Sequence, residues 1–298
     1  MAEDRANTAW RDAAAPSDKL LIGLIGAGIQ ASRAPFLHEQ EAAAQGLRCL
    51  YQLIDITRLG LGTEALGELL SAAERTGFAG LNITHPCKQA VIPHLTALSS
   101  EAAGIGAVNT VVFADGKRTG YNTDASGFAE SFRRNMAGAV LNRVVQLGAG
   151  GAGAAVAHAA LVLGVARLTL VDADPARAEA LAARLSQHFG PGRALAASRA
   201  DEALAQADGL INATPIGMVG HPGQPIATEL LRPALWVADV IYTPLETALI
   251  GAARALGCRT LPGGGMAVFQ AVEAFGLFTG RPADPDRMLR HFAQLTAS

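Results

Sequence analysis

The chain has few cysteines, and the three that it has do not form a recognisable site. Cys49, Cys87 and Cys258 are far apart and odd in number, and no pair stands at CxxC spacing. Neither a disulfide framework nor a metal site such as a zinc centre is therefore expected. A reducing compartment, the cytoplasm, fits this cysteine usage best.

The sequence also lacks an excess of charge, a long uninterrupted apolar run and a targeting segment. Its 24 basic and 26 acidic residues leave no basic stripe, so a nucleic-acid partner is not expected. The longest apolar stretch, 152–171, is interrupted by His158, Gly164 and Arg167, which favours a helix followed by a strand over a membrane span. Residues 1–19 mix acids with bases and contain no apolar core, so they are interpreted as a mobile tail rather than a leader.

What the chain does contain is an alternation of strand-like and helix-like segments. Half of its 298 residues are apolar, and a length near two times roughly 150 residues favours two domains. Expected strands at 20–25, 47–54 and 78–84 alternate with helices at 35–45 and 62–76. This order is typical of parallel strands joined by crossovers, which is an α/β layer.

A hairpin and a second α/β unit follow. Asp115-Gly116 is a tight-turn signal between two β-rich runs, and a helix is expected near 125–137. From Arg143 strands and helices alternate again to about Pro262, and the remaining segments are helical by period. These C-terminal helices are expected to pack back on the first domain.

Two glycine-rich turns compete as phosphate loops, and the second has the better context. Gly148, Gly150 and Gly153 follow a strand and open a long alanine-rich helix, and Asp172 ends the next strand. Backbone N–H groups and the helix dipole can then face a pyrophosphate, so a dinucleotide site is predicted here.

The first turn has G-x-G-x-x-A spacing at Gly26, Gly28 and Ala31, with Asp55 ending the following strand. Pro35 is compatible with a helix start only at the first position, which leaves an irregular loop before it. Such a loop suits a substrate better than a dinucleotide.

Asp172 predicts which dinucleotide is bound. A carboxylate at the end of the second strand accepts hydrogen bonds from the ribose 2′-hydroxyl and repels a 2′-phosphate, so NAD is favoured over NADP. Asp174 adds a second negative charge, and Arg177 is the one nearby cation that could weaken this preference. The alternative interpretation of Arg177 is a solvated helix charge.

With these segments in place, the chain resembles the shikimate/quinate dehydrogenase family over nearly all of residues 20–290. The resemblance rests on eight motifs in order: SRAP (32–35), NITHPCK (82–88), GAVNT (106–110), GYNTD (120–124), GAGGAG (148–153), NATPIGM (212–218), DVIYTPLET (239–247) and GGGM (263–266) with Gln270.

The resemblance implies two α/β domains with a cleft between them. Residues 20–125 together with 266–298 would form a substrate-binding domain, and residues 126–265 a Rossmann domain that binds NAD. The implied activity is reversible hydride transfer between the C3 hydroxyl of shikimate or quinate and nicotinamide, as in aromatic amino acid biosynthesis or in a catabolic direction. A monomer or a homodimer is compatible with the sequence.

The resemblance also carries over individual residues. Lys88 and Asp124 match the family's catalytic pair. The substrate contacts match Ser32, Thr84, Lys88, Asn109, Asp124, Tyr242 and Gln270. The cofactor site matches Gly148, Ala149, Gly150, Gly151, Gly153, Asp172, Arg177, Asn212, Thr214, Met218, Val240 and Gly263.

The chemistry of alcohol oxidation gives Lys88 an independent rationale. Hydride transfer from a secondary alcohol requires removal of the hydroxyl proton, and a general base contributes roughly 10²- to 10⁴-fold. A partly desolvated lysine can be that base, with Asp124 orienting it. Taken alone, Lys88 would be interpreted as a solvated residue near a helix start, and Asp124 as a cap for a helix beginning at Ala125.

Two departures from the family pattern bear on specificity. Ala34 stands where the family commonly has Ser or Thr, and losing one hydrogen bond to a charged group costs roughly 1.5 to 3 kcal/mol. Asp172-Ala173-Asp174 replaces the Asn-Arg-Thr turn with which many biosynthetic members bind NADP.

Several other functions remain open from the sequence. One is an NADP-dependent biosynthetic shikimate dehydrogenase, another is an amino-shikimate dehydrogenase, and a third is a non-catalytic relative that senses NAD or substrate. A two-domain dehydrogenase acting on a folate is disfavoured by Lys88, Asp124 and Gln270.

Overall fold

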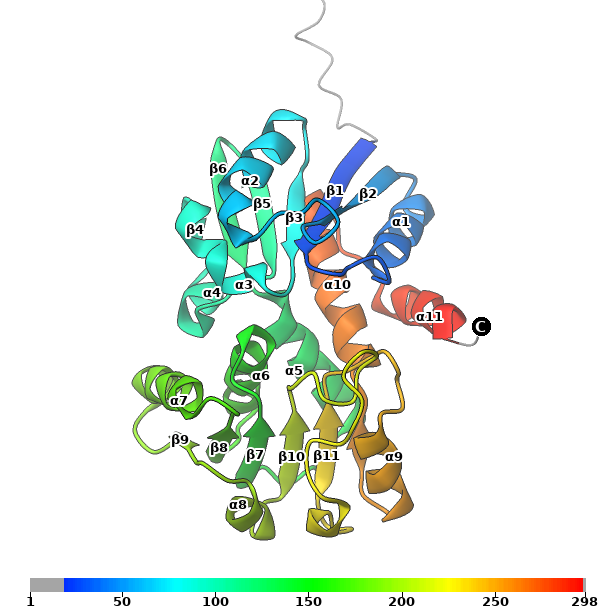
Figure 1. The fold of residues 1–298 in the computed structure, drawn as a ribbon. Coiled ribbons are helices and arrows are strands. Elements are labelled where there is room, and N and C mark those ends of the chain that lie inside the picture. The colour runs from blue at the N-terminus through cyan, green and yellow to red at the C-terminus, as the bar shows by residue number, and fades with distance from the viewer. Residues whose placement is uncertain (1–18, 297–298) are drawn as a thin grey trace, which may run out of the picture.

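The computed structural model of the chain describes residues 19–296, which form two lobes, each built around a six-stranded sheet (Figure 1). The sheet of the first lobe has the strand order β2-β1-β3-β5-β6-β4. Its strands are β1 (Lys19–Gly26), β2 (Arg48–Asp55), β3 (Gly80–Ile83), β4 (Ala97–Leu98), β5 (Thr110–Ala114) and β6 (Lys117–Tyr121). Strands β1, β2 and β3 are parallel, β5 runs antiparallel to both β3 and β6, and β4 pairs with β6 in parallel.

The sheet of the second lobe is entirely parallel, with the strand order β12-β11-β10-β7-β8-β9. Its strands are β7 (Arg143–Leu147), β8 (Arg167–Val171), β9 (Ala194–Ala196), β10 (Gly209–Asn212), β11 (Trp236–Asp239) and β12 (Thr260–Leu261). From β7 the chain adds β8 and β9 on one side, and it then crosses over to add β10, β11 and β12 on the other side. The direction in which strands are added to the sheet therefore reverses at β7. In open α/β sheets ligands bind at the carboxyl ends of the strands on either side of such a switch point.

Helices cover both sheets. They are α1 (Ala34–Ala44), α2 (Leu66–Arg75), α3 (Cys87–Ala90), α4 (Ser100–Ile105), α5 (Thr123–Asn135), α6 (Gly151–Val162), α7 (Pro175–Phe189), α8 (Asp201–Ala205), α9 (Ala248–Ala255), α10 (Gly264–Thr279) and α11 (Pro285–Thr296), with short 3₁₀ turns η1 (Thr63–Ala65), η2 (Ile92–His94) and η3 (Thr228–Leu230).

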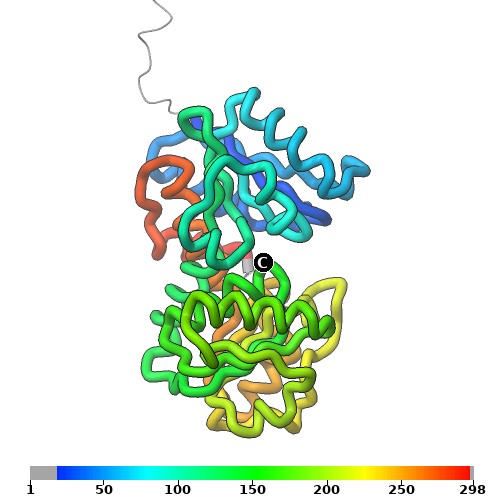
Figure 2. Tube along the Cα trace, turned by 90° about the vertical axis from the view of Figure 1, so that its left-hand side faces the viewer, coloured from blue at the N-terminus to red at the C-terminus, as the bar shows by residue number. Residues whose placement is uncertain are grey.

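Two helices join the lobes. Helix α5 leaves the first lobe, and α10 returns from the second lobe and packs along α5. Figure 2 shows the two lobes one above the other, with these segments between them. The contact is close because Gly127 on α5 faces the backbone of α10, where an added Cβ would lie 2.7 Å from the Gln270 nitrogen. Helices α10 and α11 also pack against α1 of the first lobe.

Most of the elements predicted from the sequence form where they were expected. The Asp115-Gly116 turn joins β5 to β6, and both residues have positive φ, at 51° and 68°, as a tight hairpin turn requires. The α/β architecture is confirmed. The predicted tail, 1–19, lies outside the described residues except for Lys19, which begins β1.

None of the helices within residues 19–296 is both long and apolar enough to cross a membrane. The predicted helix at 152–163 and strand at 166–172 form as α6 and β8, with Gly164 at φ 103° in the turn between them.

Candidate active site

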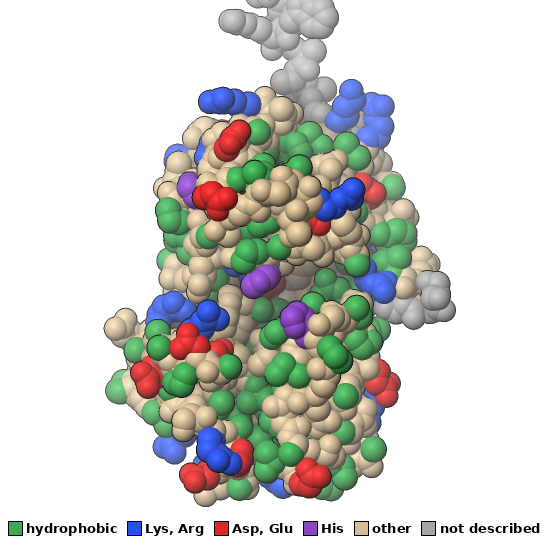
Figure 3. Space-filling view, in the orientation of Figure 1, with side chains coloured by type: hydrophobic (Ala, Val, Ile, Leu, Met, Phe, Trp, Pro, Cys, Tyr) green, Lys and Arg blue, Asp and Glu red, His purple; other side chains and the backbone are tan. Residues whose placement is uncertain are grey.

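A cavity of about 190 Å³ lies between the lobes, where Figure 3 shows a hollow across the face of the molecule. It is lined by residues from the first lobe, from α6 and the loop after β11 of the second lobe, and from both C-terminal helices. The lining residues are Leu24, Ser32, Arg33, Ala34, Leu37, Tyr51, Asn82, Ile83, Thr84, Lys88, Asn109, Asp124, Ala152, Val240, Tyr242, Met266, Ala267, Gln270 and Phe292.

All seven residues predicted to contact substrate line this cavity, although they are spread over more than 230 positions of sequence. The residues are Ser32, Thr84, Lys88, Asn109, Asp124, Tyr242 and Gln270. Their side chains carry hydroxyl, amide, amine and carboxylate groups. One concave site with several convergent polar groups is the usual form of a binding site for a small polar molecule.

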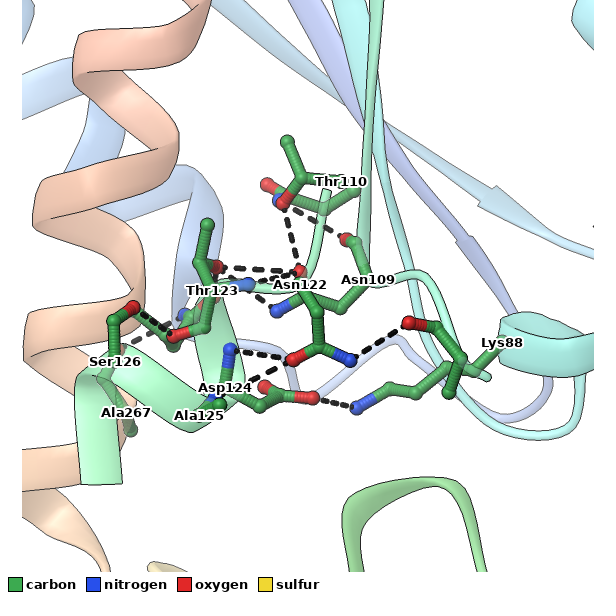
Figure 4. A network of polar contacts seen from close by, with 12 residues as sticks. Lys88, Asn109, Thr110, Asn122, Thr123, Asp124, Ala125, Ser126 and Ala267 are labelled. Atoms are coloured by element: carbon green, nitrogen blue, oxygen red, sulfur yellow. Dashed lines mark hydrogen bonds and ion pairs between the residues drawn. The ribbon is translucent and has the colours of Figure 1, made fainter. Parts of the chain in front are cut away.

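Lys88 and Asp124 form an ion pair inside the cavity (Figure 4). Lys88 lies on α3, just beyond β3, and its Nζ atom is 2.5 Å from Oδ2 of Asp124 on α5. The two side chains are only 16% and 10% exposed. The amine therefore points into the site rather than into bulk solvent, and its position is set by the carboxylate.

The start of α5 is held by a network that fixes Asp124. Asn122 caps the helix, since its Oδ1 accepts hydrogen bonds from the amides of Asp124 and Ala125, and its Nδ2 donates to the Ala107 carbonyl. The interpretation of Asp124 as the cap is wrong: the helix begins two residues earlier, at Thr123, which leaves the Asp124 carboxylate to Lys88. Asn109 adds to the network by accepting from the Thr123 amide at 2.8 Å.

Tyr242 lines the cavity together with the charged side chains of Arg33 and Asp124. Burial raises the pKa of its phenol, the positive charge of Arg33 lowers that pKa, and the negative charge of Asp124 raises it. A neutral hydroxyl is thus present in the cavity throughout the physiological pH range, available as a hydrogen-bond donor or acceptor.

The lining residues that the sequence analysis did not assign to the site include Arg33, Tyr51 and Phe292. The Tyr51 hydroxyl donates to Asn82 Oδ1 at 2.8 Å, which places an aromatic wall beside the polar side chains. Phe292 comes from α11, near the end of the chain. The amphipathic pattern of α11 indicates a buried face, but it does not indicate which site that face covers.

The two glycine turns differ in whether their backbone amides are free to bind a phosphate. In the first, the carboxylate of Asp55 accepts hydrogen bonds from the amides of Gly28 and Ile29, at 3.0 and 3.1 Å. The amides that would face a phosphate are therefore already paired with an anion. Helix α1 begins only at Ala34, so the positive end of its dipole does not lie at the glycine turn itself.

In the second turn, α6 begins at Gly151, directly after the loop, and no side chain caps its first amides. A Cβ at Gly153 would lie 2.3 Å from the Gly148 carbonyl oxygen, so only glycine permits this close packing. A Cβ at Gly150, by contrast, would meet nothing within 4 Å, which leaves the loop open on that side. This geometry fits a bound pyrophosphate.

The second turn also lies beside Lys88. A Cβ added to Gly151 would be 3.4 Å from the Cβ of Lys88, so the helix N-terminus of the second lobe approaches the ion pair of the first. A dinucleotide on this loop would therefore extend toward the cavity that holds Lys88 and Asp124.

Asp172 lies at the end of β8, next to the glycine turn. Its Oδ2 accepts from the Ala149 amide at 2.7 Å, and its Oδ1 accepts from the Asp174 amide at 2.9 Å. Arg177 is paired with Asp174, with 3.3 Å between Nε and Oδ2, and its side chain is 66% exposed. Asp172, Asp174 and Arg177 together carry a net negative charge, and Arg177 is already paired with Asp174.

A buried polar network shapes the loops after β10 and β11. Asn212 Oδ1 accepts from the amide and the hydroxyl of Thr214, and its Nδ2 donates to Asp239. Burial raises the pKa of Asp239, although hydrogen bonds from the Ile241 amide, the Thr247 hydroxyl and Asn212 lower it. Asn212 is fully buried, so it acts by holding Thr214 in place.

The remaining predicted cofactor residues lie around the same edge of the sheet. Val240 lines the cavity, and Gly263 packs against it so closely that a Cβ would lie 2.3 Å from the Val240 carbonyl oxygen. Met218 is 40% exposed in the loop that follows Thr214. No group of three or more metal-ligating side chains gathers within the described part of the chain.

Comparisons with known proteins agree with this geometry. Residues 24–111 match the family model for the shikimate dehydrogenase substrate binding domain. A shikimate dehydrogenase (NADP(+)) of Streptomyces avermitilis is 61% identical over 283 residues, which cover 94% of this chain and 97% of that protein. A quinate/shikimate dehydrogenase (NAD(+)) of Corynebacterium efficiens is 50% identical over 281 residues, which cover 93% and 99%.

A solved structure is similar over the whole fold. Quinate dehydrogenase from Corynebacterium glutamicum in complex with NAD superposes with a TM-score of 0.87 at 46% sequence identity, covering 93% of this chain and 99% of that one.

Proposed function

The chain belongs to the shikimate/quinate dehydrogenase family, and from this premise we propose that it oxidises the C3 hydroxyl of shikimate or quinate with NAD as the preferred cofactor. As a member of this family it is an oxidoreductase that acts on CH–OH groups and uses a nicotinamide cofactor. The observation that carries the proposal is the Lys88–Asp124 ion pair beside the glycine turn of the second lobe.

We propose the following roles for the cavity residues. In its uncharged form Lys88 accepts the hydroxyl proton of the substrate as the carbonyl forms, and the resulting ammonium, paired with Asp124, returns this proton when the reaction runs toward the alcohol. Asp124 orients the amine, and its free oxygen can accept a hydrogen bond from a ring hydroxyl. A bound nicotinamide ring would take up the hydride from the same carbon. Oxidation of the alcohol releases one proton overall, so Lys88 passes this proton to solvent before the next turnover.

The domain boundaries that follow from these roles are also proposals. Residues 20–125 with 266–298 hold the acid, and residues 126–265 hold the dinucleotide. The seven substrate residues belong to the first group except Tyr242, which reaches the cavity from the loop after β11.

The preference for NAD is supported by the charge of the turn after β8. The Asp172 carboxylate retains lone pairs for a ribose hydroxyl, and a 2′-phosphate of about −1.5 to −2 charge would be repelled by both Asp172 and Asp174. Arg177 offers little compensation because it is exposed and paired with Asp174. The relative from C. efficiens carries an NAD(+) name.

A second candidate is NADP-dependent shikimate oxidation, which is favoured by the NADP(+) name of the S. avermitilis relative. Steady-state kinetics with both cofactors and both acids distinguishes the two. We expect kcat/KM to be higher with NAD than with NADP by at least tenfold. A higher value with NADP would overturn the role proposed for Asp172, and turnover of neither acid would overturn the proposed function.

A further inference from the structure

The charges that line the cavity do not cancel. Three lining residues are charged: Arg33, Lys88 and Asp124. Lys88 and Asp124 neutralise each other at 2.5 Å, whereas no carboxylate of the described residues forms an ion pair with Arg33. The wall of the cavity therefore carries one positive charge that the surrounding described side chains do not balance, which suits an anionic ligand.

The guanidinium of Arg33 is held at the cavity rather than released to solvent. Its Nη1 donates to the Leu295 carbonyl at 2.5 Å, in the last turn of α11, and its Cζ lies 5.9 Å from the centre of the Phe292 ring. The last carbonyls of a helix have no partner within the helix, so a cation is favourable at this place. Helix α11 packs beside α1, at whose N-terminus Arg33 stands.

The side chains on either side of Arg33, Ser32 and Ala34, offer few hydrogen-bond donors for the carboxylate of a substrate. Ser32 Oγ accepts a hydrogen bond from the Ala34 amide at 3.3 Å, and its hydroxyl hydrogen is available to the cavity. Ala34 offers only a methyl group where a second hydroxyl would donate. A carboxylate has about four acceptor sites, so one hydroxyl does not satisfy it. Arg33 is the adjacent residue with several donors in a planar fork that matches a carboxylate.

The electrostatics of Tyr242 independently place Arg33 within range of the site. The positive charge of Arg33 and the negative charge of Asp124 act on the same phenol in opposite directions. Arg33, Tyr242 and Asp124 all line the same cavity, so one small molecule bound there can meet both the guanidinium and the catalytic pair.

We propose that Arg33 binds the carboxylate of the substrate and replaces the donor that Ala34 lacks. This inference rests on the proposed function, and it assigns to Arg33 the recognition of the acid group. Arg33 keeps its bond to the Leu295 carbonyl through Nη1, and the guanidinium has further N–H groups that can donate to the acid. Uncharged polyols of the same size are then poor ligands.

The test compares an acid with its uncharged ester in matched variants. We would measure kcat/KM for shikimate and for methyl shikimate, with saturating NAD, in the wild type, Arg33→Met and Arg33→Lys. In Arg33→Met the ratio of the acid value to the ester value is expected to fall by roughly 10- to 150-fold, the range for one hydrogen bond to a charged group. Arg33→Lys should retain much of the ratio because it keeps the charge.

Two further variants serve as controls. Arg58→Met removes an exposed arginine of the first lobe that does not line the cavity, and it should leave the ratio within twofold of the wild type. Adding Ala34→Thr to Arg33→Met restores a hydroxyl and should recover part of the ratio.

The outcomes distinguish recognition of the substrate carboxylate by Arg33 from a purely structural role of this residue. Equal losses for acid and ester in Arg33→Met, with a lowered Tm, would show that Arg33 only anchors α11 and would overturn the proposal. If the wild type oxidises neither acid, the proposed function fails, and calorimetric titration still decides the role of Arg33. Weaker binding of shikimate, but not of its ester, to Arg33→Met supports that role, and equal binding refutes it.

Discussion

Asp172→Asn is the substitution that most directly tests how this chain selects its cofactor. The change removes one negative charge and preserves the size of the side chain. The amide oxygen can still accept from the Ala149 amide, where Asp172 Oδ2 now lies at 2.7 Å. The new NH₂ group would face the Asp174 amide, which now donates to Oδ1 at 2.9 Å, so one local hydrogen bond is lost. We therefore expect a folded enzyme with an altered turn.

The expected magnitude follows from two effects of opposite sign on the two cofactors. For NAD, a hydrogen bond from the ribose to a carboxylate becomes one to a neutral amide, a loss of about 1 kcal/mol. For NADP, removal of one of two carboxylates relieves about 1 to 2 kcal/mol of repulsion at a half-exposed site, where the effective dielectric is high. Together these change the NAD to NADP ratio of kcat/KM by roughly 30- to 150-fold in favour of NADP.

The assay is steady-state oxidation of shikimate with each cofactor at two ionic strengths. Salt should reduce the discrimination of the wild type because it screens the repulsion of the 2′-phosphate. Asp115→Asn is the matched control, since it removes the same charge from the distant β5–β6 turn and asparagine tolerates its positive φ of 51°. A ratio that stays within threefold of the wild type in Asp172→Asn would refute the electrostatic explanation.

Three other predictions follow from single side chains. Lys88→Met should lower kcat by roughly 10²- to 10⁴-fold, with Lys117→Met on the exposed hairpin as the control; unchanged turnover would remove Lys88 from the mechanism. Burial lowers the pKa of His38 to about 3, although the charge of Glu41 opposes the shift, so the unfolded chain binds more protons below pH 6.5. The free energy of unfolding should therefore fall by up to about 1.4 kcal/mol per pH unit as the pH falls from 6.5 to 3. Denaturant titrations of His38→Phe over this range should show a smaller dependence of that free energy on pH. The same dependence as in the wild type would contradict this assignment. Arg287 donates two hydrogen bonds to the buried carboxylate of Glu41 and so attaches α11 to α1. Arg287→Met should therefore lower the free energy of unfolding by about 2 to 4 kcal/mol. A loss below about 0.5 kcal/mol, on the order of an exposed ion pair, would show that the contact is dispensable.

The sequence determined those features whose causes are local. The second glycine turn could be recognised because its strand, its glycines, the helix from Gly151 and the acid at Asp172 lie within 30 residues, and each reflects a backbone requirement. The hairpin at Asp115-Gly116 is local in the same sense, since two residues with positive φ define the turn. The motifs that carry Lys88 and Asp124 were recognisable as members of an ordered set. The distance between the two side chains in the folded chain could not be derived from that order.

Only the tertiary structure decided the features that depend on contacts between distant segments. The pairing of Asp55 with the first glycine turn closes that loop to a phosphate, although both turns have similar spacing in the sequence. Asn122 rather than Asp124 caps α5, which leaves the carboxylate for Lys88. Arg33 reaches the cavity wall together with Phe292 because α11 docks on α1 across more than 250 residues of chain. Periodicity shows that such a helix has an apolar face, but the partner of that face is fixed by the packing of the whole molecule.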